Sequence, residues 1–169
     1  MQLEEAKLQF IQAWGKLGSE WGINRTMAQV HALLLITPGA LTTEEIMETL
    51  AISRGNANMT LRDLMGWGLV EKQHRLGERK EYFFADKDTW NIARQVAKER
   101  RKRELDPVIK ILDELSSKVE GDTNDPAYET FTKTVKDINK LAKNVDKSLE
   151  TMIKAEENWF WGSILKIFK

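Results

Sequence analysis

The segment from Ser53 to Arg62 reads Ser-Arg-Gly-Asn-Ala-Asn-Met-Thr-Leu-Arg and carries side chains suited to contact with a nucleic acid. An Asn amide can hydrogen-bond bidentately to adenine, an Arg guanidinium can do the same to guanine, and Gly lets a backbone approach a phosphate. On a helical wheel, Ala57, Leu61 and Leu64 share one narrow arc, which we expect to be buried. The remaining face presents Gly55, Asn56, Asn58, Met59 and Arg62. Most polar helix faces are simply solvated, but this one has the composition of a base-reading surface.

A basic hairpin signal follows this segment. The runs "LVEKQHR" and "RKEYFFA" flank Leu76-Gly77-Glu78, with Gly at the position of the turn. Basic side chains gather near its tip, where no core needs them: Lys72, His74, Arg75, Arg79 and Lys80. A projecting basic loop suits contact with phosphates or insertion into a narrow minor groove.

Charge is segregated along the chain, although its 26 basic and 26 acidic residues cancel overall. Residues 51–103 hold thirteen Lys or Arg and seven Asp or Glu, a net charge of +6. The segments on either side each have a net charge of −3. A polyanion would therefore meet a favourable surface only in the middle third, although charge can also segregate by chance.

Local signals predict the elements that position these residues. An amphipathic helix is expected from Gln2 to about Gly18, and a mostly apolar helix from Asn24 or Thr26 to Pro38-Gly39. Thr42, with Glu45 three residues later, forms a capping-box pattern, and Ser53 suits the N-cap of a helix over Arg54–Gly66. Three helices followed by a hairpin predict a winged helix-turn-helix in a mainly α protein.

The C-terminal half is predicted to be helical. Asp86 or Asp88 caps a long helix that Pro107 interrupts or kinks, and Pro126 lies near the first turn of the last helix. Apolar residues of that last helix repeat at alternating spacings of four and three: Phe131, Val135, Ile138, Ala142, Val145, Leu149 and Met152. Such a seam suits helix pairing. We expect an N-terminal dimerisation helix over 1–22, a DNA-binding domain over 23–86 and a helical dimerisation region over 87–169.

From about Gly18 to Glu114 the chain resembles the GbsR/MarR group of bacterial and archaeal transcriptional regulators. The resemblance is carried by the Ser-Arg-Gly-Asn run, by Gly-Trp-Gly-Leu-Val and by Gly-Glu-Arg-Lys-Glu-Tyr-Phe. It implies a homodimeric winged-helix regulator, usually a repressor. A cytoplasmic location is expected separately, because the sequence shows no signal peptide and no membrane-spanning run. The second helix of its helix-turn-helix would be Ser53–Gly66 and its wing Val70–Ala85.

These observations predict which residues would contact the bases of double-stranded DNA and which would contact its backbone. Asn56, Asn58 and Arg62 are the expected base contacts, with Gly55 and Met59 on the same face. The expected backbone contacts are Ser53, Arg54, Arg75, Arg79 and Lys80. Two recognition helices of a dimer would enter successive major grooves about 34–36 Å apart on a pseudo-palindromic operator. The alternative is a winged-helix adaptor whose basic face binds an acidic protein.

Aromatic residues raise two further hypotheses. Trp14, Trp21 and Trp90 could form a cage for a quaternary ammonium effector, because some members of the resembled group sense choline and such cages bind by cation–π attraction. Core packing at helical spacing is the favoured alternative. The tail "NWFWGSILKIFK" is expected to cover a partner subunit or the other helices rather than lie on a membrane surface.

Several function classes find no support in the residues. The chain has no Cys and two His, so neither a disulfide framework nor a metal site is expected, and no cofactor fingerprint is present. No catalytic constellation stands out, so we expect no enzyme. The N-terminus lacks the apolar block of a signal peptide, and no run is long enough to span a membrane.

Overall fold

The computed structural model describes residues 1–155, and the expectation for the aromatic tail lies outside them. The chain forms two compact units, Met1–Ile92 and the part from Ala93 onward. Unit 1 contains α1 (Leu3–Glu20), α2 (Arg25–Ile36), β1 (Leu41–Thr42), α3 (Thr43–Leu50), α4 (Arg54–Gly66), β2 (Val70–His74), β3 (Glu81–Ala85) and the start of α5 (Thr89–Arg100). Unit 2 continues with η1 (Arg101–Leu105), α6 (Asp106–Lys118) and α7 (Pro126–Lys154).

Helix α2 forms the centre of unit 1. Seven of its twelve residues are buried: Met27, Ala28, Val30, His31, Ala32, Leu33 and Leu34. Helices α1, α3 and α4 and strand β3 contact it. The nearly continuous apolar sequence of α2 therefore reflects a helix that is covered on most sides.

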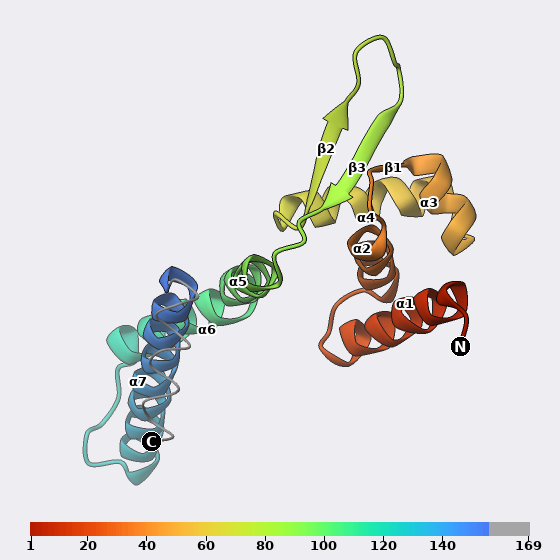
Figure 1. Ribbon diagram of the computed structural model, residues 1–169. Coiled ribbons are helices and arrows are strands. Elements are labelled where there is room, and N and C mark those ends of the chain that lie inside the picture. The colour runs from red at the N-terminus through yellow and green to blue at the C-terminus, as the bar shows by residue number, and fades with distance from the viewer. Residues whose placement is uncertain (156–169) are drawn as a thin grey trace. The chain divides into compact units, whose positions relative to one another are not determined.

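The hairpin β2–β3 projects from the helices as the wing of a winged helix-turn-helix (Figure 1). Its strands pair antiparallel from Val70 opposite Ala85 to His74 opposite Glu81. Gly77 adopts a positive φ of 83° in the turn, a conformation that glycine adopts without steric cost. The predicted fold class is confirmed, and the structure adds the two-residue strand β1, which pairs with β3 and completes the sheet order β1-β3-β2.

The predicted helix starts are confirmed by hydrogen bonds. Asn24 and Ser53 accept from the backbone N–H groups of Met27 and Asn56 at 3.2 and 3.3 Å. Thr42 and Glu45 form a reciprocal capping box at the start of α3. These caps involve residues three positions apart, so the local sequence is enough to specify them.

Two left-handed residues end the helices of the helix-turn-helix. Ala51 follows α3 with φ 52°, and Ile52 donates its N–H to the Met47 carbonyl at 3.1 Å. After α4, Gly68 has φ 70°, and Leu69 donates to the Leu64 carbonyl at 3.0 Å. These bonds satisfy carbonyls at the helix ends and turn the chain sharply, first into α4 and then into the wing.

Helix α1 uses its smallest residues to approach α2. Gly15, Gly18 and Ile11 are buried, and a Cβ added to Gly18 would lie 2.6 Å from the Cβ of Ala28. Other apolar side chains of this helix and of its C-cap residue remain exposed, to between 37 and 69%: Leu3, Leu8, Phe10, Leu17 and Trp21.

Lys87, about fifty residues further along the chain, caps the C-terminal end of α2. Its ammonium group donates to the carbonyls of Leu34, Leu35 and Thr37 at 2.7, 2.6 and 2.6 Å. A cation at this position satisfies orphan carbonyls and opposes the negative end of the helix dipole. Asp88 then caps α5 by accepting from the backbone N–H of Trp90 at 2.9 Å.

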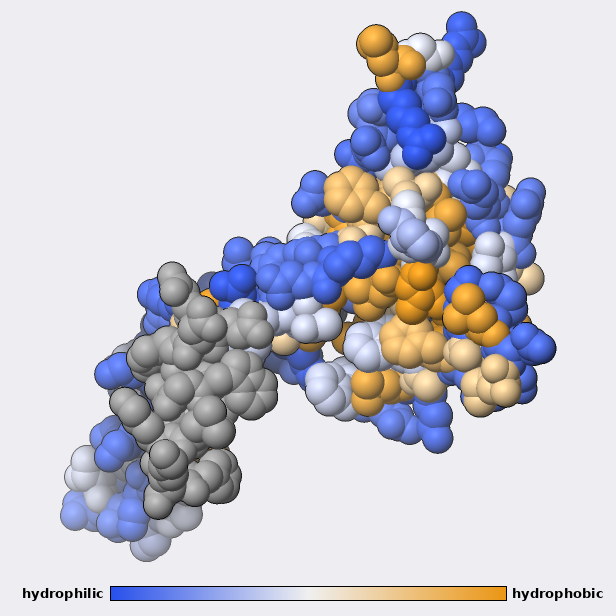
Figure 2. Space-filling model, in the orientation of Figure 1, coloured by the Kyte–Doolittle hydropathy of each residue, from blue (hydrophilic) through white to orange (hydrophobic). Residues whose placement is uncertain are grey.

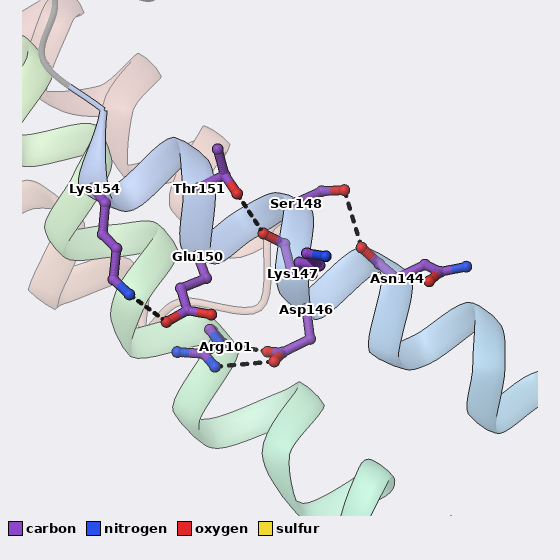
Figure 3. Close-up of polar contacts among 8 residues, drawn as sticks. All are labelled: Arg101, Asn144, Asp146, Lys147, Ser148, Glu150, Thr151 and Lys154. Carbon is purple, nitrogen blue, oxygen red and sulfur yellow. Dashed lines mark hydrogen bonds and ion pairs between the residues drawn. The ribbon is translucent and has the colours of Figure 1, made fainter.

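In unit 2, the expected interruption at Pro107 takes the form of a π-helical segment. Regular α-helix ends at Arg100, η1 follows, and Pro107 lies in the first turn of α6. Proline is tolerated there because backbone N–H groups in the first turn of a helix have no carbonyl partner within the helix, so the N–H that proline lacks is not needed. Arg101 in η1 binds both carboxylate oxygens of Asp146 in α7, which fixes the two elements together (Figure 3).

The predicted apolar seam of α7 divides between two faces. Val135 is buried and Ala142 and Leu149 are half-buried in unit 2, where α7 packs against α6 and η1. The alternating members Phe131, Ile138 and Val145 are 44, 48 and 44% exposed. Half of the seam therefore pairs within the chain, and the other half faces solvent.

The core of unit 1 contains a titratable side chain, His31. It is 4% exposed, and its Nε2 atom has no hydrogen-bond partner. Burial, followed by the nearby charge of Lys87, lowers the pKa of His31 from 6.5 to about 4. The imidazole is therefore neutral in the folded protein at physiological pH.

We expect this burial to make the protein acid-sensitive. Since unfolding returns the pKa of His31 to its higher ordinary value, the unfolded state binds more protons below pH 6.5 and gains stability there. Lowering the pH from 7 to 5 should reduce the free energy of unfolding by about 2 kcal/mol through this group. Urea denaturation of the wild type and of His31→Gln at both pH values measures it. An equal loss in the two proteins would contradict the assignment.

Candidate nucleic-acid interface

Helix α4 has one buried and one open face, as the helical wheel predicted. Ala57, Leu61 and Leu64 are at most 1% exposed, whereas Asn58 and Arg62 are exposed and Met59 is 53% exposed. Thr60, which the wheel did not assign to the core, is also buried at 2%. The open face is therefore available to a ligand because the opposite face fixes the helix in place.

The predicted base-contacting residues are not equally free. Asn58 and Arg62 lie on the open face, but Asn56 is half-buried and its amide oxygen accepts from the Thr60 hydroxyl at 3.4 Å. Gly55 is exposed, and an added Cβ there would meet nothing within 4 Å. The N-terminal part of α4 can thus be approached closely, and of the three predicted base contacts Asn58 and Arg62 are exposed.

An ion pair joins the first turns of α3 and α4. Arg54 Nη2 lies 2.8 Å from Glu44 Oε1, with the side chains 62 and 44% exposed. Next to this pair, the hydroxyl of Ser53 is used as the N-cap of α4. The expected backbone contacts Ser53 and Arg54 therefore lie at the corner of the helix-turn-helix, on its solvent side.

The wing carries a continuous solvent-exposed run from residue 71 to residue 80. Figure 2 shows mostly hydrophilic surface over the projecting hairpin, with a hydrophobic side chain at its tip, above a more hydrophobic region over the helices of the same unit. Arg79 and Lys80 are exposed near the turn, as is Arg75 at the end of β2. The three predicted wing cations are thus all accessible to a ligand.

Side-chain contacts shape this wing. The guanidinium carbon of Arg75 lies 3.8 Å from the ring centroid of Tyr82, and the Tyr82 hydroxyl donates to Glu78. This bond raises the pKa of Tyr82 above its ordinary value. Across the strands, Lys72 Nζ lies 2.9 Å from Glu81 Oε1. Arg75 is therefore held against a ring, while Lys72 is already neutralised by a carboxylate.

Electrostatics connect the wing to the helix-turn-helix. The pKa of Glu44 is lowered first by its own backbone N–H, then by the hydrogen bond from Arg54, with a further contribution from the charge of Lys80. The pKa of Glu45 is lowered mainly by Thr42, and the charges of Lys80 and Arg75 contribute. Lys80 and Arg75 therefore lie within electrostatic reach of the first turn of α3, at the helix-turn-helix corner.

The residues missed by the sequence reading are the acidic and aromatic members of this surface, Glu44, Glu78 and Tyr82. Glu44 precedes Arg54 by ten residues, a spacing with no meaning until α3 and α4 are placed side by side. Tyr82 and Arg75 pair across a hairpin, and the predicted turn could have suggested that contact.

The three tryptophans proposed for an effector site lie in different surroundings. Trp14 stacks on Phe10 with 5.5 Å between ring centroids and lies 6.5 Å from the ring of His31. Trp21 is 55% exposed, and Trp90 is half-buried. Packing against Phe10 and His31 gives Trp14 a role in the fold, and the quaternary ammonium site stays a prediction.

Among residues 1–155, no three His, Asp or Glu side chains lie together in a way that could hold a metal ion. None of the helices in that range combines the length and apolar character needed to cross a membrane.

Comparison with known proteins identifies relatives of the region just described. Residues 17–88 match the model of a family described as sugar-specific transcriptional regulator TrmB. A crystal structure described as a transcriptional regulator is similar over 88% of this chain and 95% of its own, with 17% identity and a TM-score of 0.66. The transcriptional regulator SlyA also matches, over 88% of this chain and 98% of its own, with 14% identity and a TM-score of 0.37. No curated protein matches the chain.

Proposed function

We propose that this protein is a DNA-binding transcriptional regulator that acts as a homodimer. The family match covers the helix-turn-helix and the wing, and that family is described as one of transcriptional regulators. The structural neighbour at a TM-score of 0.66 supports the same fold over most of the chain. The GbsR/MarR resemblance adds the finer expectation of a repressor that binds a pseudo-palindromic operator.

The observation that carries the proposal is the open face of α4 beside a basic wing. Asn58 and Arg62 project from a helix that is anchored on its other side, which is the arrangement by which recognition helices read the major groove. Arg75, Arg79 and Lys80 supply exposed positive charge on the wing, suited to phosphates or to the minor groove. An acidic protein partner would need the cations but not the amide-bearing face.

Two sets of exposed apolar side chains support the dimer. On α1 and its C-cap they are Leu3, Leu8, Phe10, Leu17 and Trp21, and in unit 2 they are Val108, Ile111, Leu115, Phe131, Ile138, Leu141 and Val145. Within the described part of α6 and α7, the buried residues are Val135 and Asn139. A helical hairpin that buries so little of its apolar surface gains stability by pairing with a second copy.

Replacing Arg62 tests the base-reading role. Arg62→Ala should cost about 1–3 kcal/mol of binding free energy on the preferred site and relax sequence preference at one position. Site selection from a random duplex pool, performed with wild type and variant, measures both effects. Unchanged selectivity would remove Arg62 from the reading face.

Replacing Arg79 tests phosphate contact by the wing. Arg79→Ala should weaken binding to all duplexes alike and reduce the slope of log affinity against log salt by about 1. Fluorescence anisotropy at several salt concentrations gives the slope. Lys16→Ala, the same charge change on an exposed side chain of α1, is the matched control. Wild-type protein that shows no steep salt dependence on DNA would instead favour the adaptor function.

A charge placed on the exposed seam of α7 tests the dimer. In a symmetric interface, Ile138→Glu would bury one carboxylate from each of the two subunits. It should therefore weaken self-association by about 100-fold. Sedimentation velocity over a concentration series measures the change. Lys140→Glu on the same helix adds negative charge at an exposed residue outside the seam. Equal effects of both variants, or none from Ile138→Glu, would exclude this face.

A further inference from the structure

Glu44 is placed where DNA phosphate is expected, at the corner formed by α3 and α4. It lies in the first turn of α3, and its carboxylate binds Arg54, the first residue of α4, at 2.8 Å. Arg54 is one of the expected backbone contacts, so its guanidinium is occupied by a carboxylate in the protein without DNA. The pair is at least 44% exposed on both sides, which leaves it open to exchange with a ligand.

The neighbouring acid, Glu45, has a structural role that Glu44 does not share. Its Oε2 accepts from the backbone N–H of Thr42 at 2.7 Å and from the Thr42 hydroxyl at 2.8 Å. Glu45 therefore closes the capping box, and its removal would disturb the start of α3. Glu44 takes no part in that box. Its ion pair joins two exposed side chains, and such pairs contribute little to folding.

Carboxylate and phosphate are equivalent partners for an arginine. Both present two oxygens to the planar fork of the guanidinium and accept charge-assisted hydrogen bonds. A phosphate that approached Arg54 would have to displace Glu44, and the displaced charge would remain within a few ångströms, well inside the screening length of about 10 Å. The same carboxylate also lies within reach of Lys80 on the wing.

We propose that Glu44 competes with DNA phosphate for Arg54 and thereby limits the affinity of the protein for any duplex, whatever its sequence. This inference rests on the proposed function. It assigns Glu44 as a positioning residue: it holds the Arg54 side chain at the start of the recognition helix and yields it to a backbone phosphate. Sequence-independent binding is the part of the affinity that such a competitor reduces most directly, because that part depends on phosphate contacts.

The test removes the charge of Glu44 while keeping its shape. Glu44→Gln should raise the affinity for a random duplex by about two- to fivefold. The salt slope should become steeper by up to about 0.9, since the displaced carboxylate no longer offsets the charge of Arg54 at the phosphate. Glu48→Gln is the matched control, because Glu48 is an exposed acid on the same helix. Glu44→Asp keeps the charge and should remain near wild type.

A second variant ties the effect to Arg54. In an Arg54→Ala background, Glu44→Gln should lose most of its gain, because the cation it releases is gone. Thermal melting of each variant separates a binding effect from a folding effect. Equal gains from Glu44→Gln and Glu48→Gln, or the same gain without Arg54, would overturn the competition. Wild-type protein without salt-dependent DNA binding would overturn the proposed function as well, so the two failures are distinguishable.

Discussion

The burial of one narrow face of α4 is the constraint on which the candidate interface depends. Ala57, Leu61 and Leu64 pack at the contact of α4 with α2 and its neighbours, and their near-complete burial leaves the helix no freedom to rotate. Because successive helical residues differ by about 100° in direction, fixing these three also fixes where Asn58 and Arg62 point. A ligand therefore meets a preorganised face and does not have to order it.

The wing depends on the same platform through its base. Strand β3 lies between β1 and β2. The buried residues Val70 of β2 and Phe83 and Ala85 of β3 anchor the hairpin to the helices. From this base the hairpin carries its charges outward, where solvent screens them from one another. The mixture of cations with Glu44, Glu78 and Glu81 shows that the surface is not maximised for positive charge. Such a surface can hold arginines in place and still exchange their partners, which suits reversible binding to a polyanion.

Unit 2 presents a different physical situation. Its ion pairs, such as Arg101 with Asp146 and Lys143 with Asp113 at 2.5 Å, fix the helices relative to one another inside the unit. Its apolar side chains are divided between that internal contact and solvent. Directional polar contacts thus set the geometry of the helical hairpin, whereas much of the hydrophobic surface stays exposed to solvent. This arrangement is the physical basis for the proposed dimer.

The sequence by itself determined the features that depend on residues three or four positions apart. The caps at Asn24, Thr42 and Ser53, the turn at Gly77 and the buried arc of α4 could all be predicted, because each rests on a local hydrogen bond or on helical periodicity. The winged-helix order followed from these elements.

Only the tertiary structure decided which distant groups meet. The pairing of β1 with β3, the ion pair of Glu44 with Arg54 and the bonds from Lys87 to the end of α2 join residues between ten and about fifty positions apart. Likewise, nothing local distinguishes Val135 from Ile138 in the α7 seam, yet one is buried and the other exposed. Periodicity specifies a face, but the neighbouring helix selects which part of that face is covered.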